Sequence, residues 1–282
     1  MPTSMKNFLL VCLGLGLAGA SASGALLVYH YDEAPASYNR FSSFSITAPK
    51  LNTDASFVGA AFDLSGWGWD AGGWSVSLIS PLHFVQAQHA HTAVGETVYF
   101  VNSSGVLVSA TVAAQVNVGG DLSLGTLSAP IAVDSGIRAF SLAVGDERVT
   151  YGDTLLVSGR SGLLGTNTVE SSYSYLTYDY DAVTGEAMPQ SGDSSSPTFV
   201  VDNGVLRLAA VHSYVNKLPD PTFAYDTQLS LYFPVLQQNV SSSGYSLTAV
   251  PEMASASMML GVCGALWVLV DRRRWRRGRA VN

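Results

Sequence analysis

Most of the chain between residues 66 and 240 alternates short apolar runs with turn residues. The runs are rich in Val, Tyr and Thr, and Gly, Asn, Asp or Ser separates them; clear examples are 74–79, 97–101, 106–112, 154–157, 171–180, 198–201 and 205–211. Short runs at this spacing are typical of strands in an antiparallel sandwich or barrel. The pattern therefore predicts an all-β fold.

Helical periodicity is scarce in the same region. Only Tyr232–Val240, with Pro234 near its start, predicts a short helix. The Ser-rich stretch that follows is small and polar and has no apolar face. Residues 241–249 are therefore predicted to be a linker.

The two ends of the chain have a different pattern. Phe8–Ala18 is an apolar run too short to span a bilayer, and small residues follow it up to Ala22. This order indicates a secretory signal peptide over residues 1–22. A buried N-terminal helix is the alternative, but the run lacks the polar face of such a helix. Ala254–Val270 is a second apolar run, followed by an arginine cluster, and it predicts a transmembrane helix with the arginines in the cytoplasm.

The C-terminal tail resembles a known sorting signal. Val250-Pro251-Glu252, the apolar run and the Arg-rich end look like the PEP-CTERM domain of exopolysaccharide-producing Gram-negative bacteria, over residues 250–282, although Met253 stands where that motif has a second proline. The resemblance implies an exported protein of the cell envelope or exterior. It also implies membrane contact through residues 254–270 and processing by an exosortase-like membrane protease. A plain single-pass anchor is the alternative on the topology rules alone.

Composition and charge narrow the function further. The chain has 282 residues, of which 48% are hydrophobic and 12% charged, enough for one large or two small domains and unlike a disordered chain. Residues 23–250 carry 7 basic and 19 acidic side chains, so their surface repels phosphate and nucleic acid is not an expected partner. Cys12 and Cys263 lie in the two terminal apolar runs, so the body between them forms no disulfide.

Three segments of the β-rich region carry candidate chemistry. Phe84–His89 is an apolar strand that ends on a histidine, Asp121 begins an alternating strand, and Gly192–Pro197 is a tight turn that presents Ser194. Amide hydrolysis needs a nucleophile, a base and a carboxylate that orients the base. It also needs backbone N–H groups directed at the developing oxyanion, which a glycine-containing turn can supply. The three segments supply these groups in the order that one such mechanism uses.

These segments resemble the chymotrypsin-like (trypsin-like) serine proteases over residues 66–240. The resemblance rests on ISPLHFVQAQH, on DLSLGTL and on GDSSSP followed by a hairpin with Asp202-Asn203-Gly204 at its turn. It implies a double six-stranded antiparallel β-barrel with a boundary near residue 135 and the active site in the crevice between the barrels. Residues 23–65 would lead into the first barrel. The implied activity is that of a serine endopeptidase acting on a polypeptide substrate, with no cofactor.

The same resemblance implies a role for each motif residue. His89 would be the general base, Asp121 the carboxylate that orients it and Ser194 the nucleophile. The amides of Gly192 and Ser194 would form the oxyanion hole, and Asp193 would support the loop that carries it.

The resemblance also implies a primary substrate pocket. Met188 would form its floor, and the strand that contains His212, Ser213 and Tyr214 would form its wall. A thioether offers no charge to pair with a Lys or Arg side chain. Cleavage after small or apolar residues is therefore expected.

Three departures from the family pattern keep other functions open. Gln88 replaces a small alanine, Ala90 replaces a cysteine, and Ser195 replaces a glycine, where a side chain would crowd the oxyanion loop or demand a different backbone angle. Gln88 and Ser195 favour a catalytically inactive trypsin-like protein. The Gly- and Ser-rich composition and the sorting tail favour a β-rich surface or matrix protein in which the GDS match is accidental.

Several residues compete for the assigned roles. His83 and His91 flank His89, and Asp134 and Asp146 are alternatives to Asp121. The aromatic cluster of Trp67, Trp69 and Trp74 fits either a carbohydrate platform or core packing, and core packing is the favoured interpretation. The five histidines form no pair at metal-ligand spacing, so no metal site is predicted.

Overall fold

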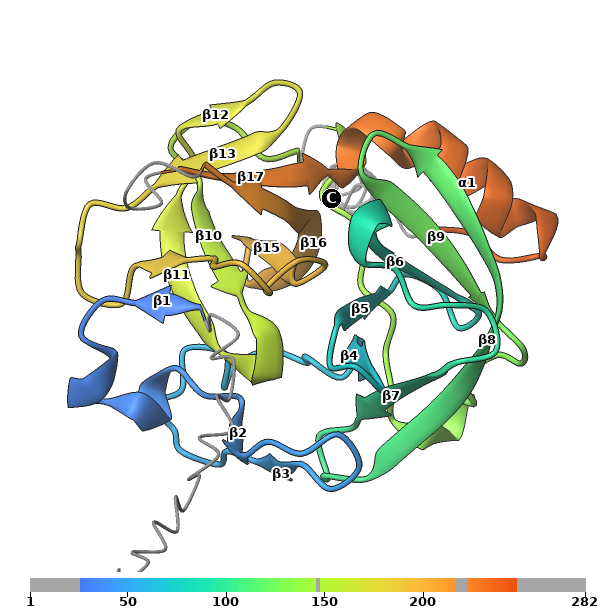
Figure 1. Ribbon diagram of the computed structural model, residues 1–282, viewed down its shortest axis with the longest axis horizontal. Coiled ribbons are helices and arrows are strands. Elements are labelled where there is room, and N and C mark those ends of the chain that lie inside the picture. Colours follow the sequence, from blue (N-terminus) through green and yellow to red (C-terminus); the bar gives the residue numbers. More distant parts are fainter. Residues whose placement is uncertain (1–25, 146–147, 217–222, 248–282) are drawn as a thin grey trace, which may run out of the picture.

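The computed structural model describes residues 26–145, 148–216 and 223–247, and this part of the chain is all-β, as predicted (Figure 1). It consists of a closed barrel and a second, curled sheet, with one α-helix after the last strand. The predicted signal peptide and the predicted apolar anchor at 254–270 lie outside the described residues. Within the described ranges, no helix has the length and apolar character needed to cross a membrane.

The first unit is a closed barrel of six antiparallel strands in the order β4-β5-β6-β9-β8-β7. Alternate residues of the strands face inward and form a core that includes Phe84, Phe100 and Leu127. Closure leaves this sheet without an open edge. The strands are β4 Trp67–Asp70, β5 Ser75–Leu78, β6 His83–Ala87, β7 Thr97–Val101, β8 Leu107–Gly119 and β9 Leu122–Leu127.

The second unit is a sheet of seven antiparallel strands in the order β11-β10-β15-β16-β17-β13-β12. The strands are β10 Thr154–Ser158, β11 Leu164–Thr168, β12 Ser171–Ser172, β13 Leu176–Asp179, β15 Pro197–Asp202, β16 Val205–Val215 and β17 Phe223–Gln228. The expectation of a second closed six-stranded barrel is therefore wrong for the described residues. The run at 171–180, expected as one strand, folds into β12 and β13.

A side chain joins β11, at one end of this curled sheet, to β13, the strand next to the other end, which no ladder among the described residues connects. Nδ2 of Asn167, in β11, donates to the carbonyl of Asp179 in β13 at 2.7 Å and to that of Ala187 at 2.9 Å. Asn167 is buried, so these bonds satisfy carbonyls that water does not reach. The bond to Asp179 thus bridges β11 and β13, which no strand ladder joins in the described residues.

Two short strand pairs attach the N-terminal segment to the rest of the fold. β1 (Leu27–Val28) pairs with β14 (Ala187–Met188) beside the second sheet, and β2 (Phe41–Ser43) pairs with β3 (Lys50–Leu51). Trp67 and Trp69 are both buried, which confirms their predicted core role, whereas Trp74, the third member of the predicted cluster, is only half-buried.

A core between the two units fixes their relative position. Val85 of β6 and Leu124 of β9 meet Phe199 and Val211 of the second sheet. Because side chains alternate along a strand, β6 places Phe84 in the barrel and Val85 in this shared core, and all five of its residues are buried. A strand buried on both faces is a rigid support for whatever follows it.

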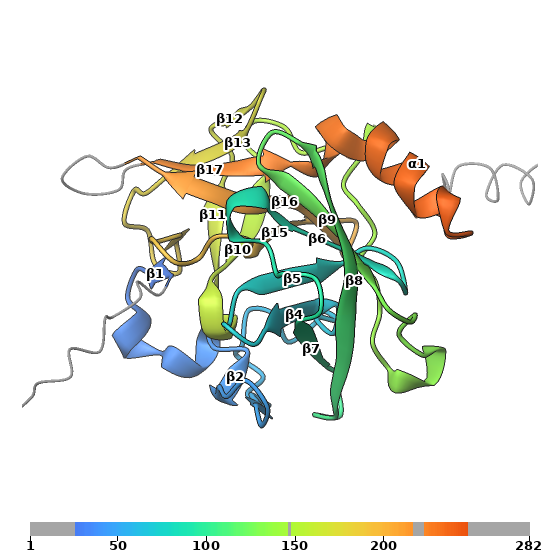
Figure 2. The same cartoon turned by 45° about the vertical axis from the view of Figure 1, so that its right-hand side comes forward.

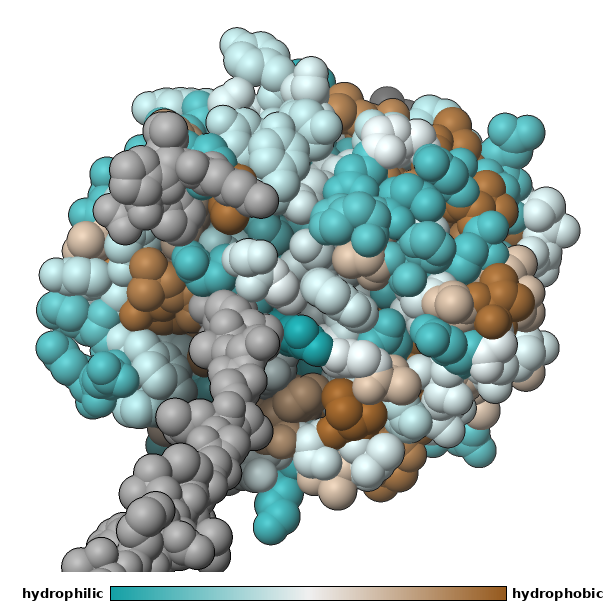
Figure 3. Space-filling model, viewed as in Figure 1, coloured by the Kyte–Doolittle hydropathy of each residue, from teal (hydrophilic) through white to brown (hydrophobic). Residues whose placement is uncertain are grey.

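The helix α1 (Phe233–Ser242) lies beside β9 of the first barrel, and its Leu236 and Val240 are buried in the shared core (Figures 1 and 2). The helix predicted at residues 232–240 is confirmed, with its boundaries shifted. The predicted linker at 241–249 needs correction, because Ser241 and Ser242 belong to the helix and Leu247 is buried in the shared core. On the face in Figure 3, apolar side chains form small separate patches among hydrophilic ones, as is usual for a protein surface.

Candidate active site

Strand pairing places His89 and Asp121, the two candidate catalytic residues of the first barrel, next to each other. In the antiparallel pair β6–β9, Ala87 lies opposite Leu122. His89 follows β6 in the short 3-10 turn Gln88–Ala90, and Asp121 immediately precedes β9. The end of one strand and the start of its antiparallel neighbour lie at the same edge of a sheet. The register therefore brings His89 to Asp121.

Asp121 binds His89 through both of its carboxylate oxygens. Oδ2 lies 2.7 Å from Nδ1 of the imidazole, and Oδ1 accepts the backbone N–H of His89 at 3.0 Å. A carboxylate on Nδ1 leaves Nε2 as the acceptor of the neutral ring. The hydrogen bond with Asp121 raises the pKa of His89 above its ordinary value, against partial burial, which lowers it.

The pKa of Asp121 lies below its ordinary value. Partial burial acts to raise this pKa, but the hydrogen bonds from the ring and the backbone of His89, together with the hydroxyl of Ser213, outweigh it. Hydrogen bonds to the charged form favour that form. Asp121 is therefore ionised at neutral pH, and it stabilises an imidazolium at His89.

Ser194 completes a chain of hydrogen bonds that crosses between the two units. It lies in the turn between β14 and β15, and its Oγ is 2.8 Å from Nε2 of His89 although 105 residues separate them. The structure thus brings together the three residues expected as base, orienting carboxylate and nucleophile. Proton transfer from a hydroxyl to an imidazole requires a contact of this length.

Two backbone amides beside Ser194 have no acceptor in the described structure. Asp193 donates its N–H to the carbonyl of Gln190, and Ser195 donates to that of His212. The N–H groups of Gly192 and Ser194, in contrast, donate to no described group. Gly192 has a φ of 107°, a conformation that side chains disfavour. The residues expected to form the oxyanion hole therefore carry free donors.

Asp193, within this turn, is fully buried. Its two carboxylate oxygens accept the backbone N–H groups of Arg160 and Gln190, each at 2.8 Å. Burial raises the pKa of Asp193 to about 6, although both hydrogen bonds lower it. The carboxylate thus holds the β14–β15 turn together through Gln190 and ties it to Arg160 in the connection between β10 and β11.

Ser195, which sequence reasoning treated as a source of crowding, is also fully buried. Its φ is 70°, so it adopts the left-handed backbone that a glycine would adopt without strain. Its Oγ accepts the N–H of Ala87 at 2.9 Å and donates to the carbonyl of Ala90 at 3.3 Å. The side chain thus points to the first barrel.

The residues expected around the substrate pocket occupy different environments. Met188 is fully buried in the core of the second unit and lies opposite Leu27 of β1. His212 is also buried, and its Nδ1 lies 2.7 Å from Oδ1 of Asp226. The hydroxyl of Ser213 lies 2.6 Å from that of Thr227 and helps to lower the pKa of Asp121, and Tyr214 is the exposed member of the group.

Tyr214 belongs to a tyrosine cluster. Its ring stacks on that of Tyr225 at a centroid distance of 4.5 Å, and the edge of Tyr175 meets it at 5.5 Å. The cluster lies one residue along β16 from Ser213, whose hydroxyl helps to lower the pKa of Asp121.

Among the described residues, the alternative candidates for the roles of His89 and Asp121 do not take part in this hydrogen-bonded chain. His83 is buried and bonds the hydroxyl of Ser80 at 2.8 Å, and burial lowers its pKa. His91 bonds the carbonyl of Gln88 at 2.6 Å, and Asp134 is exposed in another short turn. Asp146 lies outside the described residues.

Sequence reasoning missed Arg160. Its backbone N–H binds Asp193, its guanidinium donates to the carbonyl of Gly72, and its Cζ lies 5.0 Å from the centre of the Trp74 ring. Arg160 therefore joins the turn of Ser194 to the loop between β4 and β5. Arg160 is one of five arginines between residues 23 and 250, and no motif sets it apart from the others.

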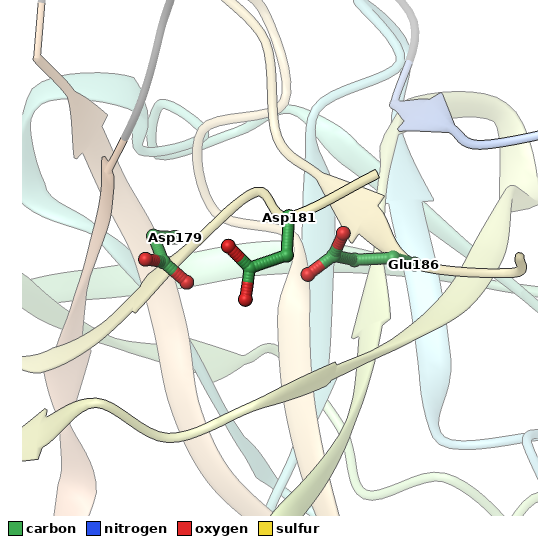
Figure 4. Close-up of side chains that lie close together, drawn as sticks. All are labelled: Asp179, Asp181 and Glu186. Carbon is green, nitrogen blue, oxygen red and sulfur yellow. The ribbon is translucent and has the colours of Figure 1, made fainter. Parts of the chain in front are cut away.

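Three carboxylates approach one another at the far side of the second sheet. One oxygen from each of Asp179, Asp181 and Glu186 lies within 4.8 Å of the others (Figure 4). Oxygen ligands of this kind suit a hard cation such as Ca²⁺. Glu186 already accepts the N–H of Val183, and acidic groups often cluster without an ion, so we assign no metal site here.

Comparison with known proteins adds no family to this description, because no protein-family model and no curated protein sequence matches the chain.

Proposed function

We propose that the chain is an exported serine endopeptidase with Ser194 as nucleophile, His89 as general base and Asp121 as the carboxylate that orients the base. The observation that supports it most strongly is the hydrogen-bonded chain from Asp121 through His89 to Ser194. The closed barrel and the curled sheet are compatible with a chymotrypsin-like fold. These residues meet where the two units meet.

The proposed reaction proceeds through an acyl-enzyme. Oγ of Ser194 attacks the carbonyl carbon of the peptide bond while its proton passes to Nε2 of His89, and Asp121 stabilises the imidazolium. The free N–H groups of Gly192 and Ser194 donate to the oxyanion. His89 then returns the proton to the leaving amine. Water releases the acyl group by the same steps, with His89 taking the proton of the water.

A free strand edge favours a polypeptide substrate. β15 pairs with β16 as far as Val211, and His212 then exchanges hydrogen bonds with Ser195 and Ser196. Beyond these bonds, no described strand lies on that side of Ser213–Val215. An extended peptide can add to such an edge through backbone hydrogen bonds. The edge begins beside Ser213, whose hydroxyl helps to lower the pKa of Asp121.

Small or apolar side chains are the proposed preference before the cleaved bond. Met188 offers no charge, so a buried Lys or Arg would lose its hydration without gaining a partner. A peptide-library digest tests this preference directly. A dominant cut after Lys or Arg would show that Met188 does not border the primary pocket.

A fluorophosphonate probe tests the central proposal, since it reacts only with an activated serine. The wild-type full chain should label and should cleave casein at pH 8. Ser194→Ala should lose both activities and keep the circular dichroism spectrum of the wild type, and His89→Ala should lose on the order of 10³-fold or more in activity. A folded wild type that neither labels nor cleaves would establish the alternative, a catalytically inactive trypsin-like or β-rich surface or matrix protein.

Export and tail processing are a separate part of the proposal. The sequence patterns at residues 1–22 and 250–282 support secretion to the envelope or exterior of a Gram-negative bacterium and cleavage near Pro251 by an exosortase-like membrane protease. Intact-mass measurement of native protein should find a chain without the arginine cluster. A mass that includes residues 272–279 would leave the plain membrane anchor.

A further inference from the structure

We propose that Ser195 is a positioning residue that holds the turn of His89 in register with Ser194. The inference rests on the proposed function, because it assigns Ser195 a part in that same site. From the family resemblance alone, Ser195 was expected to disturb the oxyanion loop, because the family has a glycine at this position. In the structure its hydroxyl bonds both ends of the turn that carries the proposed base.

The first contact satisfies a backbone donor that strand pairing leaves open. Gln88 donates its N–H to the carbonyl of Asp121 on the β9 side. Successive N–H groups of a strand point to opposite sides, so the N–H of Ala87 points away from β9. On that side β5 pairs with β6 only at Phe84 and Val85. Oγ of Ser195 accepts this donor beyond the end of β5.

The second contact satisfies the other end of the turn. A short helical turn leaves its last carbonyls without partners inside the turn. Ser195 donates to the carbonyl of Ala90, the last residue of the turn, and Ala90 is itself buried. One hydroxyl from the second unit therefore caps both ends of the three-residue turn around His89.

The backbone of Ser195 shows why a serine, rather than a glycine, matters here. At a φ of 70° a glycine would be free of strain, whereas a side chain is disfavoured. The chain nevertheless has a serine, and it uses the side chain to reach two buried backbone groups. If φ alone mattered, glycine at this position would be at least as good as serine.

Ser196, the residue after Ser195, forms a second hydrogen-bonded link between the two units. Oγ of Ser196 lies 3.2 Å from Oγ of Ser75 in β5, and the indole N–H of Trp67 donates to Ser75. All three residues are buried. Two consecutive hydroxyls after Ser194 thus bind the first barrel without a covalent crosslink. A shift of about 1 Å between the units would break the contact of His89 with Ser194.

Ser195→Gly tests this role, with Ser161→Gly as the matched control. Ser161 is another serine with positive φ (66°), but it is exposed, so its replacement relieves the same backbone strain without removing the link. In the full chain, Ser195→Gly should lower kcat at least 10-fold with KM within threefold, and the amide of Ala87 should exchange with solvent at least 10-fold faster. Ser161→Gly should change neither quantity.

The outcomes separate this inference from the proposed function. If Ser195→Gly keeps kcat and Ala87 exchange within twofold of wild type, the positioning role is wrong. If wild type neither cleaves nor labels, the proposed function fails, and Ala87 exchange still tests the link. If Ser195→Gly does not fold, hydrogen exchange in the wild type tests the inference instead. The amide of Ala87 should then exchange as slowly as the core amides of β6. Exchange at the rate of an exposed amide would overturn the inference.

Discussion

Tyr232 lies directly against Gly120, so closely that a Cβ on this glycine would be 2.3 Å from the tyrosine hydroxyl oxygen. Gly120 also has a φ of 56° and immediately precedes Asp121. Tyr232 ends the 3-10 turn before α1, so the segment that leads into the C-terminal helix packs against the loop that carries the proposed orienting carboxylate. This contact links the end of the fold to the site.

Gly120→Ala should therefore disturb the site as well as the backbone. The left-handed conformation alone costs roughly 1–2 kcal/mol for a residue with a Cβ, and the clash must also move Tyr232 or the loop. We expect the rate of fluorophosphonate labelling to fall at least 10-fold. Gly105→Ala is the control, because Gly105 has a φ of 80° with nothing within 4 Å of the added Cβ. Equal labelling by the two variants would show that the contact with Tyr232 does not position Asp121.

The pH dependence of labelling should report His89. The imidazole accepts the proton of Ser194 only when it is neutral, and the hydrogen bond with Asp121 raises its pKa above 6.5. Labelling should therefore increase with pH through a midpoint above 6.5 and then level off. The same raised pKa means that this group stabilises the fold below pH 6.5, and that the contribution is lost as pH rises through the folded pKa.

Asp121→Asn separates the carboxylate from the rest of the site. An amide has nearly the same shape but cannot stabilise the imidazolium, and it favours the wrong tautomer of His89. Activity should fall on the order of 10⁴-fold, and the midpoint of the labelling profile should move to lower pH. An unchanged midpoint would mean that Asp121 does not set the pKa of His89.

Local patterns were sufficient for the strands and for the motifs of the site. The run at Thr97–Val101 is β7 with the same bounds, because its alternation is a property of neighbouring residues. The segments around His89, Asp121 and Ser194 were likewise identifiable, since each is a short continuous motif. The structure adds their register across the two units, which no single motif contains.

Contacts between distant backbone groups could not be predicted in this way. Ser195 bonds Ala87 and Ala90, more than 100 residues earlier, so its sequence context shows only a side chain where the family has glycine. Asn167 joins β11 to β13 through the carbonyl of Asp179. No periodicity marks either residue, because the partner is a main-chain atom of a residue of any type.

Asp193 should give the stability of the fold a distinct pH dependence. Burial raises its folded pKa to about 6, above the ordinary value of 3.8. The folded state therefore holds a proton that the unfolded chain releases between these values. Stability from this group is fully present below pH 3.8 and is lost as pH rises through about 6. The free energy of unfolding, measured with urea at pH 4.5 and pH 7, should decline with pH in the wild type and decline less in Asp193→Asn. An equal decline in the two proteins would exclude the titration of Asp193 as its cause.

Asn167→Ala should destabilise the curled sheet without changing the chemistry of the site. The substitution leaves the carbonyls of Asp179 and Ala187 without the donor that they share, and an unsatisfied buried group costs about 1–3 kcal/mol. We expect the free energy of unfolding to fall by roughly this amount, measured by urea denaturation, while the labelling rate of the remaining folded protein stays within twofold. Asn167→Asp is the sharper comparison, since it keeps the shape but places a carboxylate oxygen against carbonyl oxygens, and it should destabilise more than alanine. If aspartate is instead tolerated as well as asparagine, Nδ2 of Asn167 does not hold the two ends of the sheet together.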